Sequence, residues 1–74
     1  MDGAEWITAF AAEAGVEVPS DEEVQQLLAL AGIAAHASER TAAPISCWIA
    51  ARAALDPAEA RALAARLADA PPEQ

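Results

Sequence analysis

The sequence predicts an all-α fold, a compact four-helix domain with short loops. Three observations predict this class. Helix-starting signals recur along the chain, alanine supplies 23 of the 74 residues, and apolar residues repeat with the spacing of helices. Alanine is the strongest helix former among the amino acids. No segment alternates apolar and polar residues as a half-buried strand does.

Start and stop signals place the first two helices at residues 3–14 and 21–38. Each follows a capping-box pair, in which one side chain accepts an amide hydrogen bond and an acid three residues later reaches back. The pairs are Asp2 with Glu5 and Ser20 with Glu23. Gly15 is a natural left-handed end for the first of these helices.

The last two helices are expected at residues 43–55 and 57–69. Thr41 or Ala43 should open the earlier one, with Pro44 in its first turn. The final helix has a third capping-box pair around a proline at the first helical position, where its missing N–H needs no partner. These residues are Asp56, Pro57 and Glu59.

A chain of this length forms one domain, which we place at residues 1–70 with a frayed tail at 71–74. Alanine lets helices approach closely but buries little apolar area, so the core is expected to depend on a few large side chains. The expected core residues are Trp6, Ile7, Phe10, Val24, Leu27, Leu28, Ile45, Trp48, Ile49, Leu55, Leu63 and Leu67.

The charge of the chain argues against two classes of binding partner. A net charge of -8 and the absence of lysine would repel phosphate backbones and anionic lipid head groups, so we expect neither nucleic-acid nor membrane binding. One cysteine forms no internal disulfide, and no export signal is visible. A cytoplasmic location is the expectation.

The only histidine and the only cysteine, His36 and Cys47, lie on either side of the turn between the second and third helices. A thiolate and an imidazole within reach of one another would form a nucleophile and its base. However, Cys47 lies on an alanine-rich helix face, as a small apolar filler does, and no carboxylate is placed to orient His36. Two soft ligands are also too few for a zinc site. We therefore expect no catalytic, cofactor-binding or metal-binding residues.

The same turn is the first candidate for a recognition surface. Arg40 is expected to bond the last carbonyls of the second helix, where a cation is favoured by the helix dipole. The second helix is apolar around most of its circumference, so an additional strip on it is a second candidate surface. The candidate recognition residues are His36, Glu39, Arg40, Ser46 and Trp48 at the turn, and Leu30 and Ile33 on the strip.

Several short motifs resemble a known family. They are Trp6, the pair Ala35-His36, the pair Glu39-Arg40, and Ala43-Pro44-Ile45-Ser46 with Ile49 and Ala53. Together they look like a small all-helical domain of unknown function from high-GC bacteria. That domain occurs alone or appended to the nucleotidyltransferase that makes molybdopterin guanine dinucleotide. The resemblance implies an accessory role near molybdenum-cofactor biosynthesis, and the family has no established activity that could be transferred.

The function expected from the sequence is that of a non-catalytic helical interaction domain that holds a protein partner or a second copy of itself. Two alternatives stay open. One is an acidic carrier protein modified on a serine, for which Ser20 is the candidate, although Ser20 also fits a helix N-cap. The other is a small ligand-binding or enzymatic module centred on His36, Arg40 and Cys47.

Overall fold

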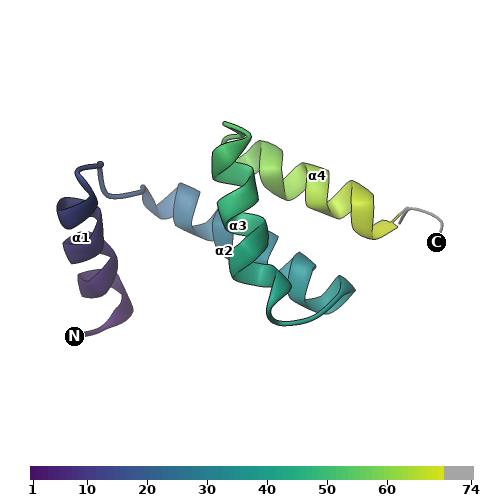
Figure 1. Cartoon of the computed structure of the whole chain (residues 1–74), viewed down its shortest axis with the longest axis horizontal. Coiled ribbons are helices and arrows are strands. Elements are labelled where there is room, and N and C mark those ends of the chain that lie inside the picture. Colours follow the sequence, from purple (N-terminus) through teal and green to yellow (C-terminus); the bar gives the residue numbers. More distant parts are fainter. Residues whose placement is uncertain (70–74) are drawn as a thin grey trace.

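The computed structural model describes residues 1–69, which form four α-helices joined by short connections (Figure 1). The helices are α1 (Gly3–Ala14), α2 (Asp21–Ala37), α3 (Ala42–Arg52) and α4 (Pro57–Asp69). No strand occurs in this part of the chain. The predicted all-α class is confirmed, while the tail predicted at 71–74 lies outside the described residues.

All three predicted capping boxes are formed, at the starts of α1, α2 and α4. In α1 the Glu5 amide donates to Asp2 Oδ1 at 2.8 Å, and the Asp2 amide donates to Glu5 Oε1 at 2.9 Å. The corresponding distances are 3.1 and 2.8 Å for Ser20 with Glu23, and 2.9 and 3.1 Å for Asp56 with Glu59. Each box satisfies two amides that the helix itself leaves without a partner.

The start of α3 differs from the prediction. Thr41 precedes the first helical residue, but its backbone is already helical and its side chain caps no amide. The amides of Ala42 and Ala43 instead donate to the carbonyl oxygens of Glu39 and Arg40, at 2.9 and 3.1 Å. Within residues 1–69 the side-chain hydrogen bonds are those of the capping boxes and one from Thr8, so Arg40 does not cap α2 as expected. The Glu39 and Arg40 carbonyls, rather than a side chain, thus accept the first amides of α3.

The end of α3 also differs, because the helix stops at Arg52 rather than at residue 55. Ala54 adopts the left-handed conformation, with φ 59°. The Leu55 amide donates to the Ala50 oxygen and the Ala54 amide to the Ala51 oxygen, both at 3.1 Å. This is the Schellman pattern that ends many helices, usually with glycine in place of Ala54. An alanine there gives no sequence signal, which is why the end was predicted too late.

Helix α2 is the centre of the fold, since both α3 and α4 pack against it. The start of α2 shares a hollow with the start of α4, including Glu23 and Pro57, and the end of α2 shares another with Ala68 at the end of α4. The two helices therefore run side by side in the same direction, while α3 crosses α2 steeply (Figure 1).

Helix α1 lies at one end of the molecule, beyond the start of α2 (Figure 1). The protein is elongated as a result, with extents of 41 × 23 × 18 Å. Ala11 is buried, in a small hollow that α1 shares with Val16 and Pro19 of the following segment. Trp6 and Phe10 stack with their ring centroids 5.9 Å apart, yet both remain about 60% exposed (59% and 62%). The apolar face of α1 therefore has little cover within its own chain.

The core of the α2–α4 unit is smaller than predicted. Leu30, Ala50 and Ala60 form the buried cluster, and Leu27, Cys47, Leu55 and Ala64 pack against it. Nine of the twelve residues expected in the core are exposed, which corrects that prediction. They are Trp6, Ile7, Phe10, Leu28, Ile45, Trp48, Ile49, Leu63 and Leu67. Alanines at the helix contacts bring the backbones together, so the larger side chains lie around the contact rather than inside it.

Candidate functional site

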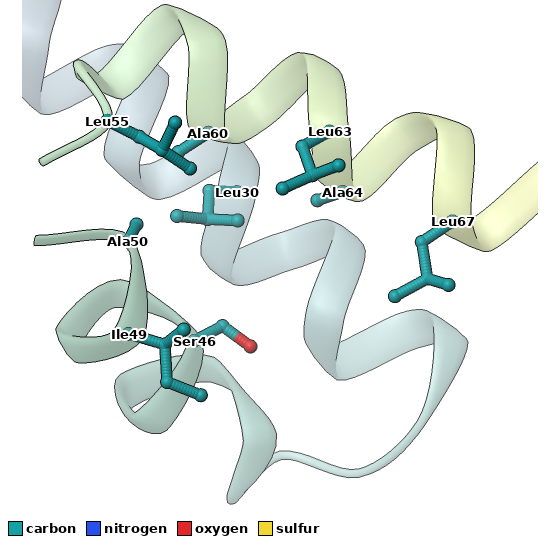
Figure 2. Close-up of a pocket in the computed structure, with 9 residues that line it drawn as sticks. All are labelled: Leu30, Ser46, Ile49, Ala50, Leu55, Ala60, Leu63, Ala64 and Leu67. Atoms are coloured by element: carbon teal, nitrogen blue, oxygen red, sulfur yellow. The ribbon is translucent and has the colours of Figure 1, made fainter. Parts of the chain in front are cut away.

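An apolar groove lies between α3 and α4, with α2 beneath it (Figure 2). Its volume is about 220 Å³. Leu30 of α2 lies in the middle, between the lining residues of α3 and those of α4 (Figure 2). We call it the α3–α4 groove; its lining residues are Leu30, Ser46, Ile49, Ala50, Leu55, Ala60, Leu63, Ala64 and Leu67.

The groove follows from the spacing of small and large residues on the two outer helices. On α4 the alanines Ala60 and Ala64 allow close approach to α2, while Leu63 and Leu67, three residues after each alanine, stand along the groove. On α3 the buried Ala50 is next to Ile49, which is 56% exposed. Small side chains leave the floor open and large ones line its sides, so the groove stays apolar and accessible.

Ser46 contributes the single hydroxyl among the lining residues. In Figure 2 its oxygen points into the space between α3 and the other two helices. Every other lining side chain is aliphatic. Such a site offers a large apolar contact with one polar group to orient an occupant.

Two arginines are close in sequence to residues that line the groove. Arg52 lies three residues after Ile49 on α3, and Arg66 lies three residues after Leu63 on α4, a spacing that places each pair on a common helix face. The Arg52 guanidinium stacks over the Trp48 ring, with Cζ 4.8 Å from the ring centroid. The outer side of α3 therefore combines the positive charge of Arg52 with the exposed aromatic surface of Trp48.

The predicted recognition residues do not gather on one surface. His36 lies in the shallow hollow near Ala68, together with Ile33. Ser46 lines the α3–α4 groove, and Trp48 lies on the exposed side of α3. Two residues of the turn, Glu39 and Arg40, are exposed. Leu30, expected on an accessible strip, is only 4% exposed and belongs to the core, but together with Ser46 it lines the α3–α4 groove.

Cys47 and His36 lie in different environments. Cys47 packs against the core cluster, whereas His36 is exposed in the hollow beside α4. Burial raises the pKa of the Cys47 thiol above its ordinary value, which disfavours the thiolate that a nucleophile requires. This environment is that of a packed apolar side chain, as the sequence predicted for Cys47.

The structure also describes the carrier-protein serine, the possible metal ligands and the length of the helices. The Ser20 hydroxyl accepts the Glu23 amide as a helix N-cap, at 3.1 Å. Across residues 1–69, no three histidine, cysteine or acidic side chains are placed to hold a metal ion. Nor does any helix in that range combine the length and the apolarity that crossing a membrane requires.

The groove was missed at the sequence level, although part of its signal is present. Leu63 and Leu67 were expected in the core, although each follows an alanine, Ala60 or Ala64, by three residues. The available signal is the size difference between these residues, because alanines permit the closest helix contact and leucines beside them remain at its edge. The position of α3 relative to α4 has no such signal.

Comparison with known proteins places the chain in a family. No curated protein and no solved structure matches it. A family model described as a domain of unknown function, DUF6457, matches residues 1–73. Since the match covers almost the whole sequence, the chain belongs to the DUF6457 family.

Proposed function

We propose that this chain is a non-catalytic protein-interaction domain whose binding site is the α3–α4 groove. The observation that carries the proposal is an accessible, almost wholly aliphatic groove in which two leucines and the isoleucine remain about half exposed: Ile49 56%, Leu63 48% and Leu67 55%. Contiguous exposed apolar surface is typical of protein-binding sites.

The dimensions of the groove favour a protein side chain as its occupant. Small-molecule sites usually have volumes of about 300–1,000 Å³. The groove measures about 220 Å³ and is only partly enclosed. An amphipathic helix that inserts one or two large apolar side chains would fit it, as in other helix-in-groove complexes.

The resemblance noted in the sequence adds a cellular context to this proposal. A domain of this type appended to, or acting beside, the nucleotidyltransferase of molybdopterin guanine dinucleotide synthesis would serve as a docking module in molybdenum-cofactor biosynthesis. Loss of the chain should then lower the activity of molybdenum enzymes in the source cells. Unchanged activity would remove this context and leave the groove as an interaction site.

Photo-crosslinking tests the groove directly. A photoreactive p-benzoylphenylalanine at Leu63 should capture a defined protein in the source cells. The same group at Ala62, which is exposed but does not line the groove, is the matched control and should capture none. The change Leu63→Asp should abolish binding of the captured protein. Equal capture from both positions, or none from Leu63, would contradict the proposal.

A further inference from the structure

We propose that the α3–α4 groove binds helix α1 of a second copy of this chain, so that two copies exchange their α1 helices. The inference rests on the proposed function, because it names the partner that the groove receives. Reciprocal exchange around a two-fold axis forms two identical contacts and closes the assembly at a dimer.

The first argument is that α1 needs a packing partner. It has 12 residues, and helices of fewer than about 12–15 residues are marginal in water without tertiary contacts. Its capping box and Gly15 end define the helix, but Trp6 and Phe10 stay about 60% exposed (59% and 62%). These two stacked rings form the largest apolar group on α1, and large aromatic side chains are the usual anchors of protein interfaces.

The second argument is the surface of the chain. A folded protein of this mass is expected to expose about 4,300 Å². This chain exposes 5867 Å². The difference, about 1,600 Å², exceeds the ~800 Å² that each partner buries in a standard interface.

The third argument is charge. Residues 1–20 carry four acidic side chains and no arginine, whereas all four arginines of the chain lie between residues 40 and 66. Glu13 lies three residues after Phe10, on the same side of α1. Residues 40–66, which supply most of the groove lining, carry those four arginines and two acids, Asp56 and Glu59, and are therefore net positive. An α1 helix that places Phe10 in the groove therefore brings its negative charge to a net positive part of the partner copy.

The chain's own α1 is less suited to the groove in this conformation. Val16 and Pro19 of the connecting segment line the same small hollow as Trp6 and Phe10, and α1 lies beyond the start of α2. Leu30, in the middle of the groove, is ten residues beyond Ser20, or about 15 Å along α2. A second copy brings its α1 to the groove without disturbing that hollow.

Disulfide trapping between two different chains tests the exchange. In a Cys47→Ala background, a full-length chain with Phe10→Cys is mixed with one carrying Leu63→Cys in a glutathione redox buffer. We expect a disulfide-linked pair containing one copy of each. The matched control replaces Leu63→Cys with Leu28→Cys, because Leu28 is 67% exposed but does not line the groove. Equal linkage in the control, or no linkage with Leu63→Cys, would overturn the proposal.

Oligomeric state gives the second measurement. Light scattering during size exclusion should give twice the 7.6 kDa mass of one chain. Phe10→Ala and Leu63→Ala should each raise the dissociation constant at least tenfold, and Leu28→Ala should not, while circular dichroism verifies that each variant is folded. A monomer at tens of micromolar would overturn the exchange.

One further outcome separates this inference from the proposed function. A single Cys47→Ala chain carrying both Phe10→Cys and Leu63→Cys, oxidised at a concentration at which the parent chain is dimeric, should form linked dimers. An internal disulfide in a monomer would show that α1 binds the groove of its own chain. That result would overturn the exchange between two copies, while the groove would remain a helix-binding site. Capture of a different protein by the groove of a monomeric chain would do the same. Failure of the groove itself would appear in the Leu63 photo-crosslinking experiment.

Discussion

Helix α1 and the α2–α4 unit follow the same local rules but differ in their tertiary contacts. Both have capping boxes, and both contain a helix that ends at a left-handed residue, Gly15 after α1 and Ala54 after α3. Only the α2–α4 unit has a buried cluster built from several helices. The difference shows that local signals suffice to define a helix, whereas its place in the fold depends on which small residues let another helix approach.

Two tryptophans let the two regions be observed separately. Trp6 lies in α1 and Trp48 in α3. The variant Trp6→Phe leaves fluorescence that reports on the α2–α4 unit, and Trp48→Phe leaves fluorescence that reports on α1. Urea unfolding of these single-tryptophan chains, at concentrations below dimer formation, measures each region by itself.

The largest effect is expected in the core of the α2–α4 unit. Leu30 is 4% exposed, so Leu30→Ala should lower the free energy of unfolding by about 3 kcal/mol through lost burial and a cavity. The matched control is Leu28→Ala in the same helix. Leu28 is 67% exposed, and its change should cost less than about 0.5 kcal/mol. Similar losses for the two variants in the Trp48 signal would contradict the observed core.

The capping boxes should have unequal effects in the two regions. Asp56→Ala removes the cap of α4 and should lower the unfolding free energy reported by Trp48 by about 1 kcal/mol. Asp2→Ala removes the same kind of cap from α1. Because α1 shares no core with the other helices, that variant should lower α1 helicity while leaving the Trp48 transition unchanged. A shift of the Trp48 transition by Asp2→Ala would show that the two regions are coupled.

The two helix ends give opposite expectations. Ala54 has φ 59°, a conformation that costs an alanine roughly 1–2 kcal/mol and a glycine almost nothing. Glycine loses more conformational entropy than alanine on folding, which offsets part of this gain. Ala54→Gly should therefore stabilise the α2–α4 unit by about 0.5–1 kcal/mol. Gly15→Ala should destabilise α1 through the same strain, at φ 79°. A destabilising Ala54→Gly would indicate that α3 does not end in this way.

Smaller effects are expected at the turn between α2 and α3. Neither Arg40 nor His36 donates a side-chain hydrogen bond within residues 1–69, and both are exposed. Arg40→Ala and His36→Ala should therefore each change stability by less than about 0.5 kcal/mol. A loss near 1 kcal/mol for Arg40→Ala alone would restore the capping role that the sequence suggested. Thermal unfolding of both variants beside the parent chain makes this comparison.

The features predicted correctly from sequence are those set by residues close to one another. Asp2, Ser20 and Asp56 each have a partner three residues later, so the starts of α1, α2 and α4 were predicted correctly. Gly15 identified the end of α1. The end of α3 was predicted too late, because an alanine in the left-handed conformation has no sequence signature.

The groove and the core depend on distances between helices, which the sequence does not specify. Leu30 and Leu28 are two residues apart with the same side chain, yet one is buried and the other is exposed. Their difference depends on where α3 and α4 cross α2. Trp6 and Phe10 were expected in the core because of their size, although both remain about 60% exposed (59% and 62%). From the sequence, therefore, only separate parts of the candidate site could be predicted, namely leucines close to alanines in the same helix.

The smallest predicted effect concerns Cys47 in the α2–α4 unit. Burial raises the pKa of its thiol in the folded chain above that in the unfolded chain. The unfolded chain thus releases its proton first as the pH rises, so stability should fall above the pKa of an exposed thiol, about 8.5. Cys47→Ala should remove that part of the pH dependence. Thiol labelling at pH 7.5 should also be slower in the folded chain than in urea, because the packed thiol is shielded and forms little thiolate. Equal labelling rates, together with a parent chain whose stability does not fall above about pH 8.5, would contradict this prediction. They would indicate that Cys47 is at the surface and that α3 packs on the core in a different orientation.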